Sequence, residues 1–221
     1  MIDDAAPTRL RDRIARDLAP VAPLRKPWLR AAAALPLGVL LLFAASALYG
    51  LRGDAGRLGW GLTWGLSTVE LALGMLLIGM ALRDAVPGRV LTPRAVAASF
   101  GAAVGAVVLI TLVTWRVSPT RIVSESVAYV TSICFGYTLL AAVPVILFAG
   151  LLAARAYPLR PQIAGAMYGA GAGLLSDAGW RLFCHYSDPG HVLPSHLGAV
   201  VAASLLGALL GRLLRGVRSC L

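Results

Sequence analysis

The stretch that decides the fold is residues 129–154, YVTSICFGYTLLAAVPVILFAGLLAA, which contains no acidic or basic side chain. A helix needs about 20 apolar residues to cross the hydrocarbon core of a bilayer. This stretch is longer than that, so it predicts a membrane-spanning helix. The fold then depends on how many further stretches of this kind the chain contains.

The whole chain has the composition of a membrane protein. Of its 221 residues, 58% are hydrophobic and 14% are charged, whereas a soluble domain carries about a quarter charged residues. Five more apolar runs occupy residues 31–49, 61–82, 95–115, 162–183 and 196–214. The predicted fold class is therefore all-α, a polytopic membrane protein with six transmembrane helices and a short N-terminal helix in the cytoplasm.

The distribution of positive charge predicts the orientation of these spans. With the N-terminus inside, 15 of the 20 lysine and arginine residues fall in the inner segments and 5 in the outer loops. An excess of lysine and arginine marks the cytoplasmic side of a membrane protein. Both termini are therefore predicted to be cytoplasmic, which divides the chain into residues 1–30, a membrane domain at 31–214 and a tail at 215–221.

The N-terminal segment is polar and rich in arginine. Leu10, Ile14 and Leu18 recur every four residues and form a helical stripe. Thr8 can cap the start of this helix, and Pro20 can end it. Two interpretations remain open: the stripe binds a partner protein in the manner of a helix in a groove, or the helix lies on anionic lipid.

Two functional classes find little support in the sequence. The net charge of +10 comes from arginines at the ends of apolar runs rather than on one basic face, so no direct binding of nucleic acid is expected. The chain has no phosphate-binding glycine loop, nucleophile elbow or zinc-protease motif. We therefore expect a protein that is not an enzyme.

Two acidic residues lie within the predicted spans. Glu70 is near the middle of 61–82, and Asp177 is toward the outer end of 162–183. Ionisable groups at membrane depth are costly and indicate candidate functional sites. A structural polar contact, a role in signalling and ion transport all remain open for this pair.

Small residues recur at helix-packing distances. They form one stripe of Gly165, Gly169 and Gly173 and another of Ala203, Gly207 and Gly211, while Gly101 and Gly105 form a single pair. Such spacing lets helix backbones approach closely within a membrane. Packing within one chain and a dimer interface are both compatible with it.

Cysteine and histidine gather near the outer side. The stretch RLFCHYSDPGHVLPSH, residues 181–196, holds Cys184 and the candidate ligands His185, His191 and His196. Thiolate and imidazole suit zinc or copper(I), although their spacing here matches no standard zinc motif. Pro189, Gly190 and Pro194 predict a turn. A structural metal site, a reversible metal or redox sensor and a plain interfacial loop remain open.

A second cysteine is predicted on the same side of the membrane. Cys134 lies near the outer start of 129–154, whereas Cys220 is in the cytoplasmic tail. In an oxidising compartment, Cys134 and Cys184 can form a disulfide or bind a soft metal if the helices bring them together. The histidines would complete such a metal site or tune thiol reactivity. Apart from this reversible metal binding, no cofactor is expected.

Several motifs resemble the NrsF family of negative regulators of sigma-F. The resemblance begins with LAPVAPLRKPWLR (18–30) and continues with Cys134 followed by LAAVP (140–144). It is most specific in ARAYPLRPQIAGAMYGAGAGLL (154–175), RLFCHYSDPGHVLPSHLG (181–198) and GALLGRLLR (207–215). One departure is Ser195-His196, where the family often has an aromatic residue.

The resemblance implies a function in transcription regulation and stress response. It implies an inner-membrane anti-sigma factor that holds an extracytoplasmic-function sigma factor at the membrane and releases it on an external metal or oxidant. Cys134 and Cys184 correspond to the paired outward-facing cysteines of the family. The stripe of Leu10, Ile14 and Leu18 is expected to bind the sigma factor. The alternatives are a small transporter and a structural subunit of a membrane complex.

Overall fold

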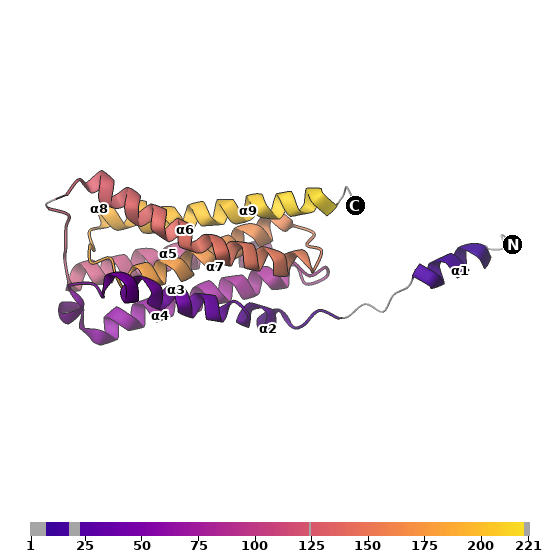
Figure 1. Cartoon of the computed structure of the whole chain (residues 1–221), viewed down its shortest axis with the longest axis horizontal. Coiled ribbons are helices and arrows are strands. Elements are labelled where there is room, and N and C mark those ends of the chain that lie inside the picture. Colours follow the sequence, from indigo (N-terminus) through magenta and orange to yellow (C-terminus); the bar gives the residue numbers. More distant parts are fainter. Residues whose placement is uncertain (1–7, 18–22, 124, 219–221) are drawn as a thin grey trace.

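The computed structural model describes residues 8–17, 23–123 and 125–218, and most of them form long helices that run side by side (Figure 1). The helices are α1 (Thr8–Asp17), α2 (Pro27–Ala32), α3 (Leu35–Tyr49), α4 (Ala55–Asp84), α5 (Pro93–Val117), α6 (Val127–Ala154), α7 (Pro161–Trp180), α8 (Pro189–Val192) and α9 (Gly198–Arg218), with a π-helical turn, η1 (Leu193–Leu197), before α9. The described residues contain no strand. The predicted all-α class is confirmed.

Five helical segments are long and apolar enough to cross a membrane. They are Pro27–Tyr49, Ala55–Asp84, Pro93–Val117, Val127–Ala154 and Pro189–Leu214. They correspond to five of the six apolar runs identified in the sequence, with α2 and α3 together forming the first. The remaining run forms α7, which is not among the five, so the count of six spans stays a prediction.

The helix boundaries follow local signals. Proline occupies the first turn of α5 and α7, where its missing N–H is not needed. The Oγ1 atom of Thr92 accepts a hydrogen bond from the Ala95 N–H at 3.2 Å and caps the start of α5. Gly59 has φ 75° and ψ 153°, so the backbone leaves helical geometry there, near the predicted start of this span at residue 61.

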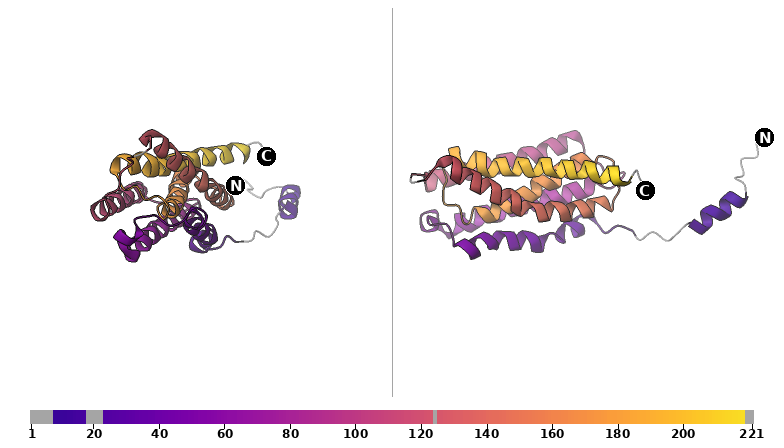
Figure 2. Two further views of the ribbon diagram at one scale, coloured as in Figure 1. Left: turned by 60° about the vertical axis from the view of Figure 1, so that its left-hand side comes forward. Right: turned by 45° about the horizontal axis from the view of Figure 1, so that its top comes forward.

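α7 occupies the centre of the bundle. Every residue from Met167 to Trp180 is buried, and α7 contacts α3, α4, α6 and α9 (Figure 2). A helix exposed to lipid needs apolar side chains toward the lipid, whereas a helix enclosed by protein needs only surfaces that fit its neighbours. This position is consistent with the many small residues of α7 and with Asp177 near its end.

Glycine makes these close contacts possible. A Cβ atom added to Gly165 would overlap the carbonyl oxygen of Gly207, and one added to Gly169 would overlap that of Ala203. The two stripes identified in the sequence therefore pack against each other, α7 against α9, within one chain. By contrast, apart from the nearby backbone of α5 itself, no atom of the described residues lies within 4 Å of a Cβ added to Gly101 or Gly105.

One expectation about the outer segment was wrong. Pro189, Gly190 and Pro194 were expected to make residues 184–196 a turn, but the chain is helical from Pro189 onward through α8 and η1. Proline at the start of a helix needs no hydrogen-bond donor, so Pro189 begins α8 rather than preventing it. His191 and His196 consequently lie on the helical segment that leads into α9.

The Gly169 contact predicts opposite effects for two glycine-to-alanine changes. Gly169→Ala should destabilise the protein by about 1–3 kcal/mol, because the added methyl group overpacks the α7–α9 contact. Gly105→Ala is the matched control and should be neutral or stabilising by up to about 1 kcal/mol, since alanine favours helix more than glycine. Thermal unfolding of the detergent-purified proteins measures both, and equal effects would contradict this packing.

Candidate functional site

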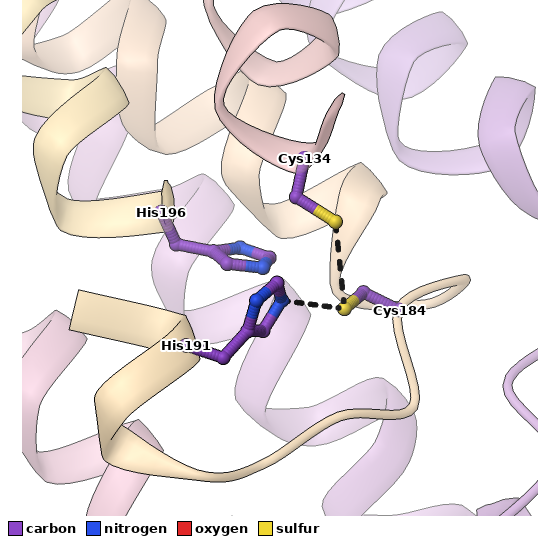
Figure 3. Close-up of side chains that lie close together, drawn as sticks. All are labelled: Cys134, Cys184, His191 and His196. Carbon is purple, nitrogen blue, oxygen red and sulfur yellow. Dashed lines mark hydrogen bonds between the residues drawn. The ribbon is translucent and has the colours of Figure 1, made fainter. Parts of the chain in front are cut away.

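Cys134 and Cys184 come together although 50 residues separate them in the chain. Cys134 is the eighth residue of α6, and Cys184 follows the end of α7. Their Sγ atoms are 3.9 Å apart, and both side chains are buried as free cysteines. Figure 3 shows the two sulfur atoms facing each other. The pair is close enough to share one ligand.

Two histidines complete this group. His191 lies in α8 and His196 in η1. Residues five apart in a regular α-helix point about 140° apart, because a turn takes 3.6 residues. The wider π-helical turn alters this relation, and the two imidazole rings lie with their centroids 5.8 Å apart.

The four side chains form a buried cluster of potential metal ligands. Cys134, Cys184, His191 and His196 each offer an atom within 4.8 Å of the others. The Nε2 atom of His191 lies 3.5 Å from the Cys184 Sγ (Figure 3). The Nε2 atom of His196 is buried and has no hydrogen-bond partner. We call these four residues the Cys–His cluster.

His185 does not belong to this cluster. Its side chain is exposed, and its ring packs on Tyr186 with a centroid distance of 4.2 Å. Three of the four candidate ligands in the 181–196 stretch therefore meet Cys134, and His185 is the one that points elsewhere. Sequence spacing could not distinguish it, because the direction of each side chain depends on where the helix resumes.

Both clustered histidines make a hydrogen bond at their Nδ1 atom. The Nδ1 atom of His196 is hydrogen-bonded to the Asp177 carboxylate. The Nδ1 atom of His191 lies 3.1 Å from the Thr131 hydroxyl. Because a carboxylate accepts hydrogen bonds, Nδ1 of His196 is the donor in this contact, and Nε2 is left for the cluster.

Asp177 and Glu70 share a buried counter-ion. The Nε atom of Arg181 lies 2.9 Å from Asp177 Oδ2 and 3.2 Å from Glu70 Oε2. All three side chains are buried. The two intramembrane acids thus form one ion-pair network with Arg181, and Asp177 joins this network to His196.

Sequence reasoning did not identify Arg181 as part of the site. It treated this residue as one of the positive charges of an outer loop. An available signal was its position four residues after Asp177, which places an acid and an arginine on the same side of a helix end. A buried arginine could not be expected from this spacing alone, because it depends on α4 bringing Glu70 to the same place.

The loops around the cluster are tied together by buried polar contacts. Arg52 donates hydrogen bonds to Asp54 from Nε at 2.6 Å and from Nη2 at 3.0 Å. Ser118 donates to Asp54 Oδ2 at 2.7 Å. The Arg52 N–H donates to the Leu182 carbonyl oxygen at 2.8 Å. The segment that carries Cys184 is therefore fixed to the α3–α4 loop.

The electrostatics of this loop favour a charged Asp54. Burial alone would raise the pKa of Asp54, but the hydrogen bonds from Arg52 and Ser118 and the nearby guanidinium charge lower it below its ordinary value. A group whose pKa is lowered on folding stabilises the folded state at pH values above its unfolded pKa, about 3.9 for Asp. This stabilisation is lost only as the pH falls through the lowered pKa.

Comparison with protein families agrees with the sequence motifs. A family model described as NrsF, negative regulator of sigma F, matches residues 14–215. The chain belongs to the NrsF family. The match spans nearly the whole chain and includes both cysteines of the cluster. None of the curated proteins and none of the solved structures matches the chain. The NrsF description implies that the partner is a sigma factor.

The expected sigma-binding residues of this NrsF-family chain lie partly within the described structure. Leu10 and Ile14 are on α1, and their side chains are 49% and 51% exposed. Figure 1 shows α1 apart from the helix bundle. Leu18 and Cys220 lie outside the described residues. The apolar stripe of α1 is thus free for a partner at least at Leu10 and Ile14.

Proposed function

We propose that this protein is an inner-membrane anti-sigma factor that sequesters an extracytoplasmic-function sigma factor and releases it on a periplasmic metal or redox signal. The observation that carries the proposal is the buried meeting of Cys134 and Cys184, 3.9 Å apart, in a chain of the NrsF family. A buried thiol pair linking separate helices can change helix packing when it binds or reacts. The protein acts as a regulator and not as an enzyme.

The proposed topology has six spans with both termini in the cytoplasm. Burial of α7 among α3, α4, α6 and α9 supports counting it as the sixth span, because its neighbours shield it from lipid. The excess of lysine and arginine on the inner side supports the orientation. Of the five positive residues assigned to the outer side, Arg52 and Arg181 are neutralised in buried ion pairs. The Cys–His cluster then lies at the periplasmic end.

Reporter fusions test this topology. Alkaline phosphatase fused after Leu221 should be inactive, because the enzyme matures only in the oxidising periplasm. The same reporter inserted after Arg121, in the α5–α6 loop, should be active and serves as the control. Strong phosphatase activity from the C-terminal fusion would overturn both the topology and periplasmic sensing.

The N-terminal helix is the proposed sigma-binding element. Its exposed Leu10 and Ile14 suit recognition of a helix in an apolar groove. The arginines of this helix also suit anionic lipid, and partner and membrane can hold the same stripe in turn. The membrane domain would then determine whether the stripe is available.

Changing the stripe should separate regulation from membrane insertion. Leu10→Asp combined with Ile14→Asp should abolish retention of the sigma factor, because charged side chains cannot enter an apolar groove, while the protein stays in the membrane. Co-purification with the sigma factor and target-gene output measure the effect. Leu10→Met combined with Ile14→Val keeps the stripe apolar and should retain binding. Normal repression by the Asp pair would show that α1 is not the interface.

The cysteine pair is the proposed sensor. Oxidation would remove two protons and two electrons from the thiols, pass the electrons to an oxidant such as a peroxide, and join the sulfurs. Metal capture would remove two protons and leave two thiolates on the ion. Either event changes the contact between α6 and the segment after α7, and repacks the helices that continue to the cytoplasmic side.

Serine substitutions test the sensor. Replacing Cys134 and Cys184 together with Ser should make target-gene output insensitive to metals and oxidants, because neither a disulfide nor thiolate coordination can form. Cys220→Ser is the matched control and should leave the response intact, since this residue is assigned to the cytoplasmic tail. A double Ser variant with a normal response would rule out the cysteine pair as the sensor.

No observation favours the alternative of a transporter. Glu70 and Asp177, which could have lined an ion path, are paired with Arg181 inside the bundle. Such a closed ion-pair network supports a positioning role in which Arg181 holds the end of α7 against α4. A structural subunit of a larger complex would not need the buried Cys–His cluster.

A further inference from the structure

We infer that the Cys–His cluster is a closed tetrahedral Zn²⁺ site whose ligands are Cys134 Sγ, Cys184 Sγ, His191 Nε2 and His196 Nε2. The inference deepens the proposed function, because it names the ion that the cysteine pair holds and adds both histidines as ligands. It also changes the nature of the sensor. The periplasmic signal acts on the occupancy of a four-ligand zinc site rather than on two bare thiols.

Two of the distances between the ligand atoms match those around a tetrahedral ion, and all four atoms lie within 4.8 Å of one another. Zinc binds sulfur at about 2.3 Å and imidazole nitrogen at about 2.0–2.1 Å, which at tetrahedral angles separates two sulfurs by about 3.8 Å and a sulfur from a nitrogen by about 3.5 Å. The two sulfurs are 3.9 Å apart, and Cys184 Sγ is 3.5 Å from His191 Nε2. A disulfide would instead require the sulfurs to lie about 2.05 Å apart.

The unpartnered nitrogen of His196 points independently to a ligand. His196 is 1% exposed, and its Nε2 atom lacks a hydrogen-bond partner. A buried polar atom without a partner is costly unless something binds it. An ion bound within the cluster would satisfy this nitrogen.

The groups behind the ligands match those that orient histidines on metals. A metal-bound histidine usually donates its other N–H to a carboxylate, a carbonyl oxygen or water, which fixes the ring and its tautomer. Asp177 plays this part for His196, and the Thr131 hydroxyl does so for His191. Arg181, 2.9 Å from Asp177 Oδ2, holds the carboxylate in place.

The donor set and its burial favour zinc. Two sulfurs and two nitrogens in a tetrahedral arrangement are typical of structural zinc sites. On binding, Zn²⁺ displaces one proton from each thiol, and two protons leave to water. The two thiolates then neutralise the ion, so the occupied site carries no net charge that burial would penalise.

Zinc at this position would join three parts of the chain. Cys134 belongs to α6, Cys184 to the segment after α7, and both histidines to the α8–η1 segment that leads into α9. The occupied site fixes the outer ends of α6, α7 and α9 together. Loss of the ion would free these ends, so under this inference the signal acts by removing zinc and not by metal capture at bare thiols.

Metal analysis of the purified full-length protein tests the inference. The protein is isolated in detergent under reducing conditions without chelator. Inductively coupled plasma mass spectrometry should then find one zinc ion per chain. Cys184→Ser, His191→Ala and His196→Ala should each lose most of this zinc. His185→Ala is the matched control, since this histidine lies in the same stretch outside the cluster, and should keep it.

Cobalt absorption provides a second readout of the site, which can be measured on the wild-type protein. Co²⁺ added to metal-free wild-type protein should give the intense visible absorption of tetrahedral cobalt and a thiolate charge-transfer band. His196→Cys should keep the tetrahedral spectrum and strengthen that band, because it supplies a third thiolate.

Asp177→Asn should weaken zinc affinity about 10–100-fold, as expected for a residue that positions a ligand. Competition with a chromophoric chelator measures this affinity.

Clear outcomes would overturn the zinc site. A wild-type protein that holds no zinc and gives no tetrahedral cobalt spectrum would do so, as would His191→Ala and His196→Ala proteins that hold as much zinc as His185→Ala. These measurements need no sigma factor. Failure of the wild-type protein to capture a sigma factor would therefore count against the proposed function and leave the metal result intact.

Discussion

The close approach of α7 to its neighbours is the contact on which the rest of the structure depends. In a membrane, apolar surface alone gives helices little reason to associate, so packing and polar contacts must hold them. Here Gly165 and Gly169 bring α7 into backbone contact with α9, and Gly171 and Gly74 do the same between α7 and α4. A helix packed so closely on several sides leaves its neighbours little freedom to move alone. In the proposed mechanism, such close packing would carry a change at one end of α7 or α9 to the other end.

The charged groups in the core serve this arrangement. Arg181 follows the last turn of α7 and pairs with Glu70 of α4 and with Asp177 of α7 itself. Removing Arg181 would leave the two buried acids without their counter-ion, and breaking a buried ion pair in this way costs about 3–5 kcal/mol. The network therefore fixes where the chain leaves α7, and Cys184 is three residues further on. The position of Cys184 is thus set by ion pairs buried within the bundle.

The sequence predicted those features that depend on periodicity, length and charge. Apolar runs indicated the helices, and the stripes at Gly165–Gly173 and Ala203–Gly211 indicated close packing, although not with which partner. The features that it missed depend on the three-dimensional arrangement. His191 rather than His185 faces Cys134 because the chain becomes helical at Pro189. The proline and glycine residues there had predicted a turn instead. Arg181 looked like an exposed charge, because its partner Glu70 lies more than a hundred residues earlier.

The energies involved favour an ion over weaker signals as the controlling element. A ligand shifts an equilibrium only by its difference in affinity for the two states, and moving a protein from almost wholly closed to almost wholly open takes about 5.5 kcal/mol. A structural zinc ion in a small domain contributes about 10–16 kcal/mol, comparable to the whole stability of a typical protein, about 5–15 kcal/mol. A single hydrogen bond contributes only about 0.5–1.5 kcal/mol. In the proposed mechanism, zinc bound by Cys134, Cys184, His191 and His196 can therefore decide by itself how α6, α7 and α9 pack. Its loss would be sufficient to change the membrane domain that, in this proposal, determines whether the α1 stripe is available to the sigma factor.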